Sequence, residues 1–128
     1  MEFSDLLGRA RAVLGFRRLS ESGQAGTVAA ALLTAGGAVH VGVCIDLPCA
    51  LGCCAEHAAI AAMITAGESR IEKIVAVGEH GIMPPCGRCR EFISQVHDAN
   101  RDTLVMVAEG RVVRLRELLP HDWRDVKR

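Results

Sequence analysis

Apolar positions along the N-terminal half of the chain form two kinds of pattern, a helical period and continuous runs. From about Ser4 to Arg17, apolar residues recur at the three- and four-residue spacing of an amphipathic helix. Two continuous apolar runs follow, Thr27 to Thr34 and Ala38 to Ile45, and Gly36-Gly37 lies between them. Two runs split by a glycine turn are typical of a β-hairpin. The N-terminal half is therefore expected to form a helix, a polar loop and a hairpin.

The C-terminal part continues the alternation of helices and strands. Asp46 to Cys53 contains proline and glycine and is expected to be irregular, whereas the alanine-rich stretch from Cys54 to Gly67 predicts a buried helix that stops at a glycine. The remaining elements are a strand at Lys73 to Glu79, a helix from Cys86, strands at Thr103 to Glu109 and in RVVRL, and a helical turn in the tail. The order α-β-β-α-β-α-β-β-α predicts one domain, 1-128, with a central sheet between helices.

Composition and charge exclude several classes of function. The 128 residues carry 15 basic and 15 acidic side chains, and only 3% are aromatic. A neutral, aromatic-poor chain offers neither the basic groove nor the stacking platforms that nucleic-acid binding requires. The apolar runs are shorter than the roughly 20 residues that a membrane span needs. Glu2 and Asp5 at the N-terminus do not fit a secretory signal, so we expect a cytoplasmic protein that binds neither nucleic acid nor membrane.

Six cysteines add a candidate chemistry. Without a secretory signal, reduced thiols that bind a metal or catalyse are expected rather than disulfides. Cys54 opens one predicted helix, and Cys86 and Cys89 lie one turn apart at the start of the next. Free N–H groups at helix starts stabilise thiolates. Three such ligands predict a zinc site with a fourth position open to water, and Glu56 could then shuttle protons without binding the metal.

A purely structural role for these cysteines is the alternative. A closed zinc site with four cysteine ligands would leave Glu56 as an ordinary solvated helix residue. A zinc-stabilised binding or redox protein would also use the CxxC spacing of Cys86 and Cys89. Both alternatives leave the position of Glu56, two residues after a ligand, without a function.

Three motifs carry a resemblance to a known family. CAE (Cys54 to Glu56), PCGRCRE (Pro85 to Glu91) and RELLP (Arg116 to Pro120) are similar to those of the cytidine deaminase family, over roughly Thr27 to Pro120. Within that family, PCGRCR followed by RELLP most resembles the blasticidin S deaminases, a subgroup of small members. The resemblance implies an α/β fold with three α/β/α layers and a central mixed five-stranded sheet.

The resemblance also implies a reaction and an assembly. Cys54, Cys86 and Cys89 match the three zinc ligands, Glu56 matches the proton-shuttling acid/base, and the N–H of Ala55 matches a group that holds the base carbonyl. The implied activity is hydrolytic release of ammonia from a cytosine nucleoside or close analogue: cytidine, deoxycytidine or a compound like blasticidin S. Small members with three cysteine ligands usually form homotetramers, so a homotetramer is expected here.

The substrate half of the motif departs from the family pattern. Cys44 and Asp46 stand where the family carries an Asn and a Glu that hold the ribose, and Gly26 stands where it carries a base-lining Phe. These departures favour, as an alternative, a deaminase of another heteroaromatic amine. Trp123 matches a C-terminal aromatic that closes a pocket, its own or a neighbour's. His57 and Arg90 are the candidate cations near the thiolates.

Overall fold

Alternate residues of the central strand face opposite sides of the sheet, and both sides are buried. A computed structural model describes residues 1–126. In strand β2 (Gln24–Thr34), Ala29 and Ala31 belong to one apolar cluster, and Ala30 and Leu32 belong to a second. A strand with two buried faces needs a cover on each side, as its continuous apolar run indicates.

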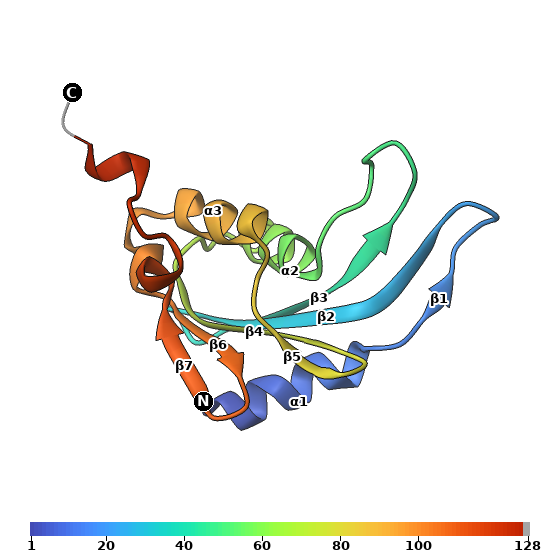
Figure 1. The fold of residues 1–128 in the computed structure, drawn as a ribbon. Coiled ribbons are helices and arrows are strands. Elements are labelled where there is room, and N and C mark those ends of the chain that lie inside the picture. The colour runs from blue at the N-terminus through green and yellow to red at the C-terminus, as the bar shows by residue number, and fades with distance from the viewer. Residues whose placement is uncertain (127–128) are drawn as a thin grey trace.

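Helices supply that cover on both faces. Helix α1 (Phe3–Val13) packs on the cluster that contains Ala29, whereas α2 (Ala55–Thr65) and α3 (Gly87–Val96) lie on the opposite face (Figure 1). Buried leucines on α1 and buried isoleucines on α2 and α3 fill the two interfaces. The predicted three-layer α/β/α arrangement is confirmed.

The sheet is mixed and open. Five strands match the predicted ones: β2, β3 (Val39–Asp46), β4 (Ile71–Gly78), β6 (Leu104–Ala108) and β7 (Arg111–Arg114). Strand β2 pairs antiparallel with β3 and with β4, β4 pairs parallel with β6, and β6 pairs antiparallel with β7. The parallel pair exists because α3 crosses over between β4 and β6.

Two short strands complete the sheet that residues 1–126 form, which therefore has seven strands in that range. Strand β1 (Arg17–Arg18) pairs with the start of β2, and β5 (Gly81–Met83) pairs with the end of β4. Both lie in segments predicted as loops or helix ends. Two or three residues are too few to produce a period, so only pairing with a neighbouring strand reveals them.

The hairpin forms as predicted, but it is longer. Strand β2 begins at Gln24 instead of Thr27, because Gln24 and Ala25 pair with Asp46 and Ile45 across the hairpin. This extension reaches past the body of the sheet beside the loop that follows β3 (Figure 1). The long arm matters for the site, because Thr27, Cys44 and Asp46 lie on it.

Glycine lets α2 approach the sheet closely. A Cβ atom at Gly42 in β3 would lie 2.4 Å from the backbone nitrogen of Ala59 in α2. Alanines on α2 and glycine on β3 thus take the place that larger side chains occupy in aromatic-rich cores. Close packing of this kind fills a core that has few aromatic side chains.

None of the helices formed by residues 1–126 is long and apolar enough to cross a membrane. The tail contains two short 3₁₀ helices, Leu115–Leu118 and Trp123–Asp125, where a single turn of helix was predicted.

The Gly42 contact gives a stability prediction. We expect Gly42→Ala to lower the free energy of unfolding by about 1–3 kcal/mol, because the new methyl group overpacks the α2 interface. Gly8→Ala is the matched control, since a Cβ there meets nothing within 4 Å and lies in α1. The control should be neutral or stabilising by about 0.5–1 kcal/mol, as glycine is a poor helix former. Urea unfolding of both variants measures the difference, and equal stabilities would contradict the close contact.

Candidate active site

Two helix starts converge over the same face of the sheet. Cys54 is the N-cap of α2 and Cys86 is the N-cap of α3, both with extended backbone. Neither helix start has a side-chain cap. The free N–H groups of each first turn therefore lie next to the sulfurs, where they favour negative charge.

Pairing with β3 fixes the approach to α2. Ile45 and Cys53 exchange two backbone hydrogen bonds of 2.9 Å across the loop that follows β3. This bridge anchors the chain one residue before Cys54. Between the paired residues, Cys49 and Ala50 adopt left-handed backbone conformations, and Cys49 is exposed.

Three sulfur atoms meet where the helices converge. The Sγ atoms of Cys54, Cys86 and Cys89 all lie within 4.8 Å of one another, and those of Cys54 and Cys86 are 3.7 Å apart. Sulfurs bound to zinc at about 2.3 Å in a tetrahedral site are about 3.8 Å apart. The cluster therefore fits a metal site, and its all-thiol donor set suits a soft or borderline ion such as zinc.

The three thiols differ in their electrostatic surroundings. Burial raises the pKa of Cys54 and of Cys89, and the Glu56 carboxylate raises both further. Burial also opposes ionisation of Cys86, but hydrogen bonds from the backbone of Cys89 and from neighbouring thiols bring the pKa of Cys86 below its usual value. Cys86 is thus the thiol that its surroundings favour as a thiolate.

Glu56 lies beside this cluster in the first turn of α2. Its side chain is only 6% exposed. Burial raises the pKa of Glu56. Hydrogen bonds with the helix backbone and with Cys89 offset part of this increase. A carboxyl group with a raised pKa can both accept and give up protons near neutral pH. The closed structural site, with Glu56 in solvent, does not fit this burial.

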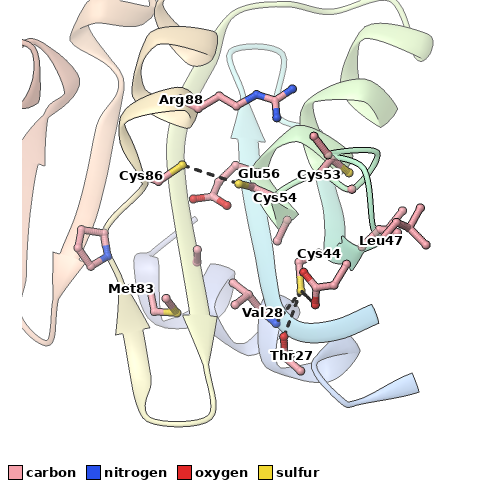
Figure 2. A pocket seen from close by; sticks show the side chains of 17 residues that line it. Thr27, Val28, Cys44, Leu47, Cys53, Cys54, Glu56, Met83, Cys86 and Arg88 are labelled. Atoms are coloured by element: carbon pink, nitrogen blue, oxygen red, sulfur yellow. Dashed lines mark hydrogen bonds between the residues drawn. The ribbon is translucent and has the colours of Figure 1, made fainter. Parts of the chain in front are cut away.

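A cavity of about 500 Å³ opens over the cluster. Figure 2 shows Cys54, Cys86 and Glu56 at one end, and Thr27, Val28 and Cys44 on the strand wall at the other. Of the residues expected at the site, this cavity brings together those lying on α2, α3 and β3: Cys44, Asp46, Cys54, Ala55, Glu56 and Cys86. Cys89 lies behind them, fully buried.

Trp123 does not reach this cavity. Its side chain is 52% exposed, and its indole N–H donates to the Glu91 carboxylate at 3.3 Å. Arg124 pairs with the same carboxylate at 3.3 Å. In its own chain Trp123 therefore packs the tail against α3, and a role in a neighbour's pocket stays a prediction.

Gly26 does not line the cavity. Its backbone conformation and its contact with Gly15 require glycine at this position. Its φ is +92°, and a Cβ atom there would lie 1.8 Å from the carbonyl oxygen of Gly15. The Gly26 carbonyl accepts a hydrogen bond from the Gly15 N–H at 2.8 Å. Glycine at this position joins the end of α1 to β2 and cannot be replaced by a pocket-lining side chain.

The two candidate cations named from the sequence have structural partners. The His57 ring stacks on Phe92 at 4.0 Å, and burial, with the charge of Arg88, lowers the pKa of His57. The Arg90 guanidinium donates to the carbonyl oxygens of Pro85, at 2.7 Å, and Leu118, at 3.5 Å. Arg90 thus ties the PCGRCRE and RELLP motifs together and holds the residue before Cys86.

Sequence reasoning missed several of the lining residues, among them Thr27, Met83 and Arg88. Arg88 was readable from its place between Cys86 and Cys89. Thr27 and Met83 carry no such signal, because only the pairing of β2 with β3 and of β5 with β4 brings them to this wall.

Solved structures match this chain over nearly its whole length, whereas no family model matches the sequence. Cytidine deaminase from Mycobacterium tuberculosis is 27% identical, with a TM-score of 0.79 over 96% of this chain and 98% of that one. Cytidine deaminase from Burkholderia pseudomallei is 29% identical, with a TM-score of 0.77 over 94% and 98%. The chain has the cytidine deaminase fold. Cytidine deaminase from Mycobacterium leprae, at 24% identity and a TM-score of 0.78 over 94% and 99%, shares that fold.

These matches confirm two predictions. The expected fold is the observed one, and the chain is an enzyme of the hydrolytic type to which its structural neighbours belong. The cytidine deaminase fold and the three-cysteine cluster together fit a metal centre at the start of α2 and α3.

Proposed function

We propose that this protein is a zinc-dependent deaminase that releases ammonia by hydrolysis from a cytosine nucleoside or a close analogue. The observation that carries the proposal is the meeting of three thiols and a buried carboxyl group in one cavity of about 500 Å³. A ligand pocket of this volume suits a small molecule. The structural matches to two cytidine deaminases at 27% and 29% identity support the same reaction class.

Cys54, Cys86 and Cys89 would hold the zinc ion. Zinc held by three protein ligands lowers the pKa of a water molecule toward about 7 and so supplies a nucleophile. Glu56 would accept one proton of the attacking water and deliver it to the ring nitrogen next to the carbon under attack. It would then move the second proton from the same oxygen to the amino group, so that the carbon–nitrogen bond breaks, ammonia leaves and a ring carbonyl remains.

Other groups of the cavity orient the substrate. The N–H of Ala55 lies in the first turn of α2, where it is free to donate to a base carbonyl. Asp46 and Cys44 are the proposed contacts to the part of the substrate that does not react. Blasticidin S is one candidate substrate, because PCGRCR and RELLP are shared with that subgroup and Arg90 connects the two motifs.

A deaminase of another heteroaromatic amine is the second candidate. Cys44 favours it, because its sulfur is already engaged by the N–H of Val28 and the hydroxyl of Thr27, at 3.3 Å each. A thiol so occupied is a weak partner for a sugar hydroxyl. Ammonia release measured with cytidine, deoxycytidine, blasticidin S and free bases distinguishes the candidates.

A cytoplasmic homotetramer completes the proposal. Helix α2 buries one side against the sheet but leaves Ala61, Ala62 and Ile64 exposed. An apolar helix face at the surface favours association with a second copy. The proposed assembly would cover these residues and bring other chains close to the cavity.

The metal proposal predicts about one zinc ion per purified chain. Cys54→Ser should lose most of this zinc because it removes one of three ligands. Cys49→Ser is the matched control, since Cys49 is exposed and lies outside the cluster. Metal analysis by mass spectrometry gives the stoichiometry, and full zinc content in Cys54→Ser would overturn the ligand assignment.

The catalytic proposal predicts that Glu56→Gln retains zinc and the fold but loses about 10²–10⁴-fold in kcat. The amide cannot carry the protons that the reaction moves. Glu79→Gln, at an exposed turn between β4 and β5, should retain the wild-type rate. Ammonia release reports the rate, and near wild-type turnover by Glu56→Gln would exclude the assigned mechanism.

The assembly predicts a mass of about 55 kDa in light scattering, four times the 13.7 kDa of one chain. Ala62→Glu should lower that mass, because it places a charge on the exposed face of α2. Ala12→Glu puts the same change on an exposed position of α1 and should leave the mass unchanged. A wild-type mass near 13.7 kDa would exclude the tetramer.

A further inference from the structure

Asp46 ends β3 at the cavity, and its carboxylate has no cationic partner within residues 1–126. Its one side-chain contact in that range is with the thiol of Cys44, which donates to Oδ2 at 3.9 Å. Asp46 is exposed and lies next to Cys44, which Figure 2 shows at the end of the cavity away from Cys54 and Cys86. It is therefore free to accept hydrogen bonds from a ligand.

The polar groups of the strand wall beside Asp46 are engaged with one another. The Val28 N–H donates to the Cys44 sulfur at 3.3 Å, the Thr27 hydroxyl lies 3.3 Å from the same sulfur, and the Cys44 thiol lies 3.9 Å from Asp46 Oδ2. Cys44 itself is 6% exposed. An ionised carboxylate only accepts, so this wall offers a ligand an acceptor with a negative charge.

The cation of the cavity lies at the other end. Arg88 comes from the first turn of α3 and lies with Cys54 and Cys86 in Figure 2, whereas Cys44, Thr27 and Val28 line the opposite end. The lining at the Asp46 end also includes four apolar residues, Val28, Ile45, Leu47 and Ala50. An apolar wall reduces the screening of the single negative charge.

We propose that Asp46 selects substrates whose non-reacting part carries a positive charge, such as an ammonium or guanidinium group. The group lies against the Asp46 carboxylate while the ring reaches Glu56. Charge-assisted hydrogen bonds to a carboxylate are stronger than those of a neutral hydroxyl, so a cation is preferred over a sugar hydroxyl. A phosphate at the same place is repelled. This inference rests on the proposed function for the identity of the reacting ring.

Three cytosine nucleosides test the preference in the metal-containing protein: cytidine, 5′-amino-5′-deoxycytidine and cytidine 5′-monophosphate. We expect kcat/KM to be about tenfold or more higher for the amino compound than for cytidine, and lowest for the phosphate. Asp46→Asn should remove the higher kcat/KM of the amino compound, chiefly by raising its KM. It should also reduce the difference in kcat/KM between cytidine and cytidine 5′-monophosphate. Asp5→Asn, on exposed α1, should change neither ratio. Equal rates with cytidine and the amino compound in the wild type would overturn the proposal.

A second measurement reads the charge of the cavity without any substrate. Cys53 lines the cavity beside Asp46, whereas Cys49 is exposed outside it and serves as an internal reference. Zinc-containing protein is treated at low salt with a cationic and an anionic methanethiosulfonate, and each cysteine is followed by mass spectrometry. The ratio of cationic to anionic labelling should be higher at Cys53 than at Cys49. Asp46→Asn should lower this ratio at Cys53 about threefold.

The two measurements separate the two proposals. An unchanged thiol ratio in Asp46→Asn overturns the cation preference, whatever the substrate is. The expected thiol ratio with no turnover of any cytosine nucleoside overturns the proposed function and leaves the cation-selecting end of the cavity supported. Thermal unfolding of Asp46→Asn checks that its fold is retained.

Discussion

The site depends on the convergence of two helix N-termini on one point above the sheet. Helix α2 begins after the loop that follows β3, and α3 begins after the loop that follows β5. Both helices lie on the same face, so their first turns meet with Cys54 and Cys86 as N-caps. Unpaired N–H groups at both starts offset the cost of placing sulfur ligands close together.

Hydrogen bonds to the backbone and one close packing contact hold this convergence. The bridge between Ile45 and Cys53 sets the entry to α2, and Arg90 sets the entry to α3 through the carbonyl of Pro85. Gly42 allows α2 to lie close enough to the sheet for Glu56 to be buried at the cavity. The raised pKa of Glu56 is a consequence of that burial, so one packing constraint supplies both the position and the chemistry of the carboxyl group.

The two ends of the cavity differ in their chemistry. Thiols and Glu56 lie at one end, as the sequence motifs indicate, and the chain shares its fold with cytidine deaminases. The far end is built on the long hairpin arm, where Thr27 and Val28 contact the Cys44 sulfur and Asp46 has no cationic partner among residues 1–126. The reaction that we propose and the substrate preference that we infer therefore lie on different elements of the fold.

The sequence by itself determined the longer elements and indicated the candidate site residues at two helix starts. Apolar stretches of eight or more residues mark α1, α2, β2 and β3, and Cys54 and Cys86 stand at helix starts, so short-range patterns were sufficient for these elements. The tertiary structure alone decided the strands β1 and β5, the place of Thr27 and Met83 in the cavity, and the contact of Trp123 with Glu91. It also decided that Gly26 joins α1 to β2 instead of marking an absent pocket residue. Each of these depends on residues distant in the chain that only strand pairing and helix packing bring together.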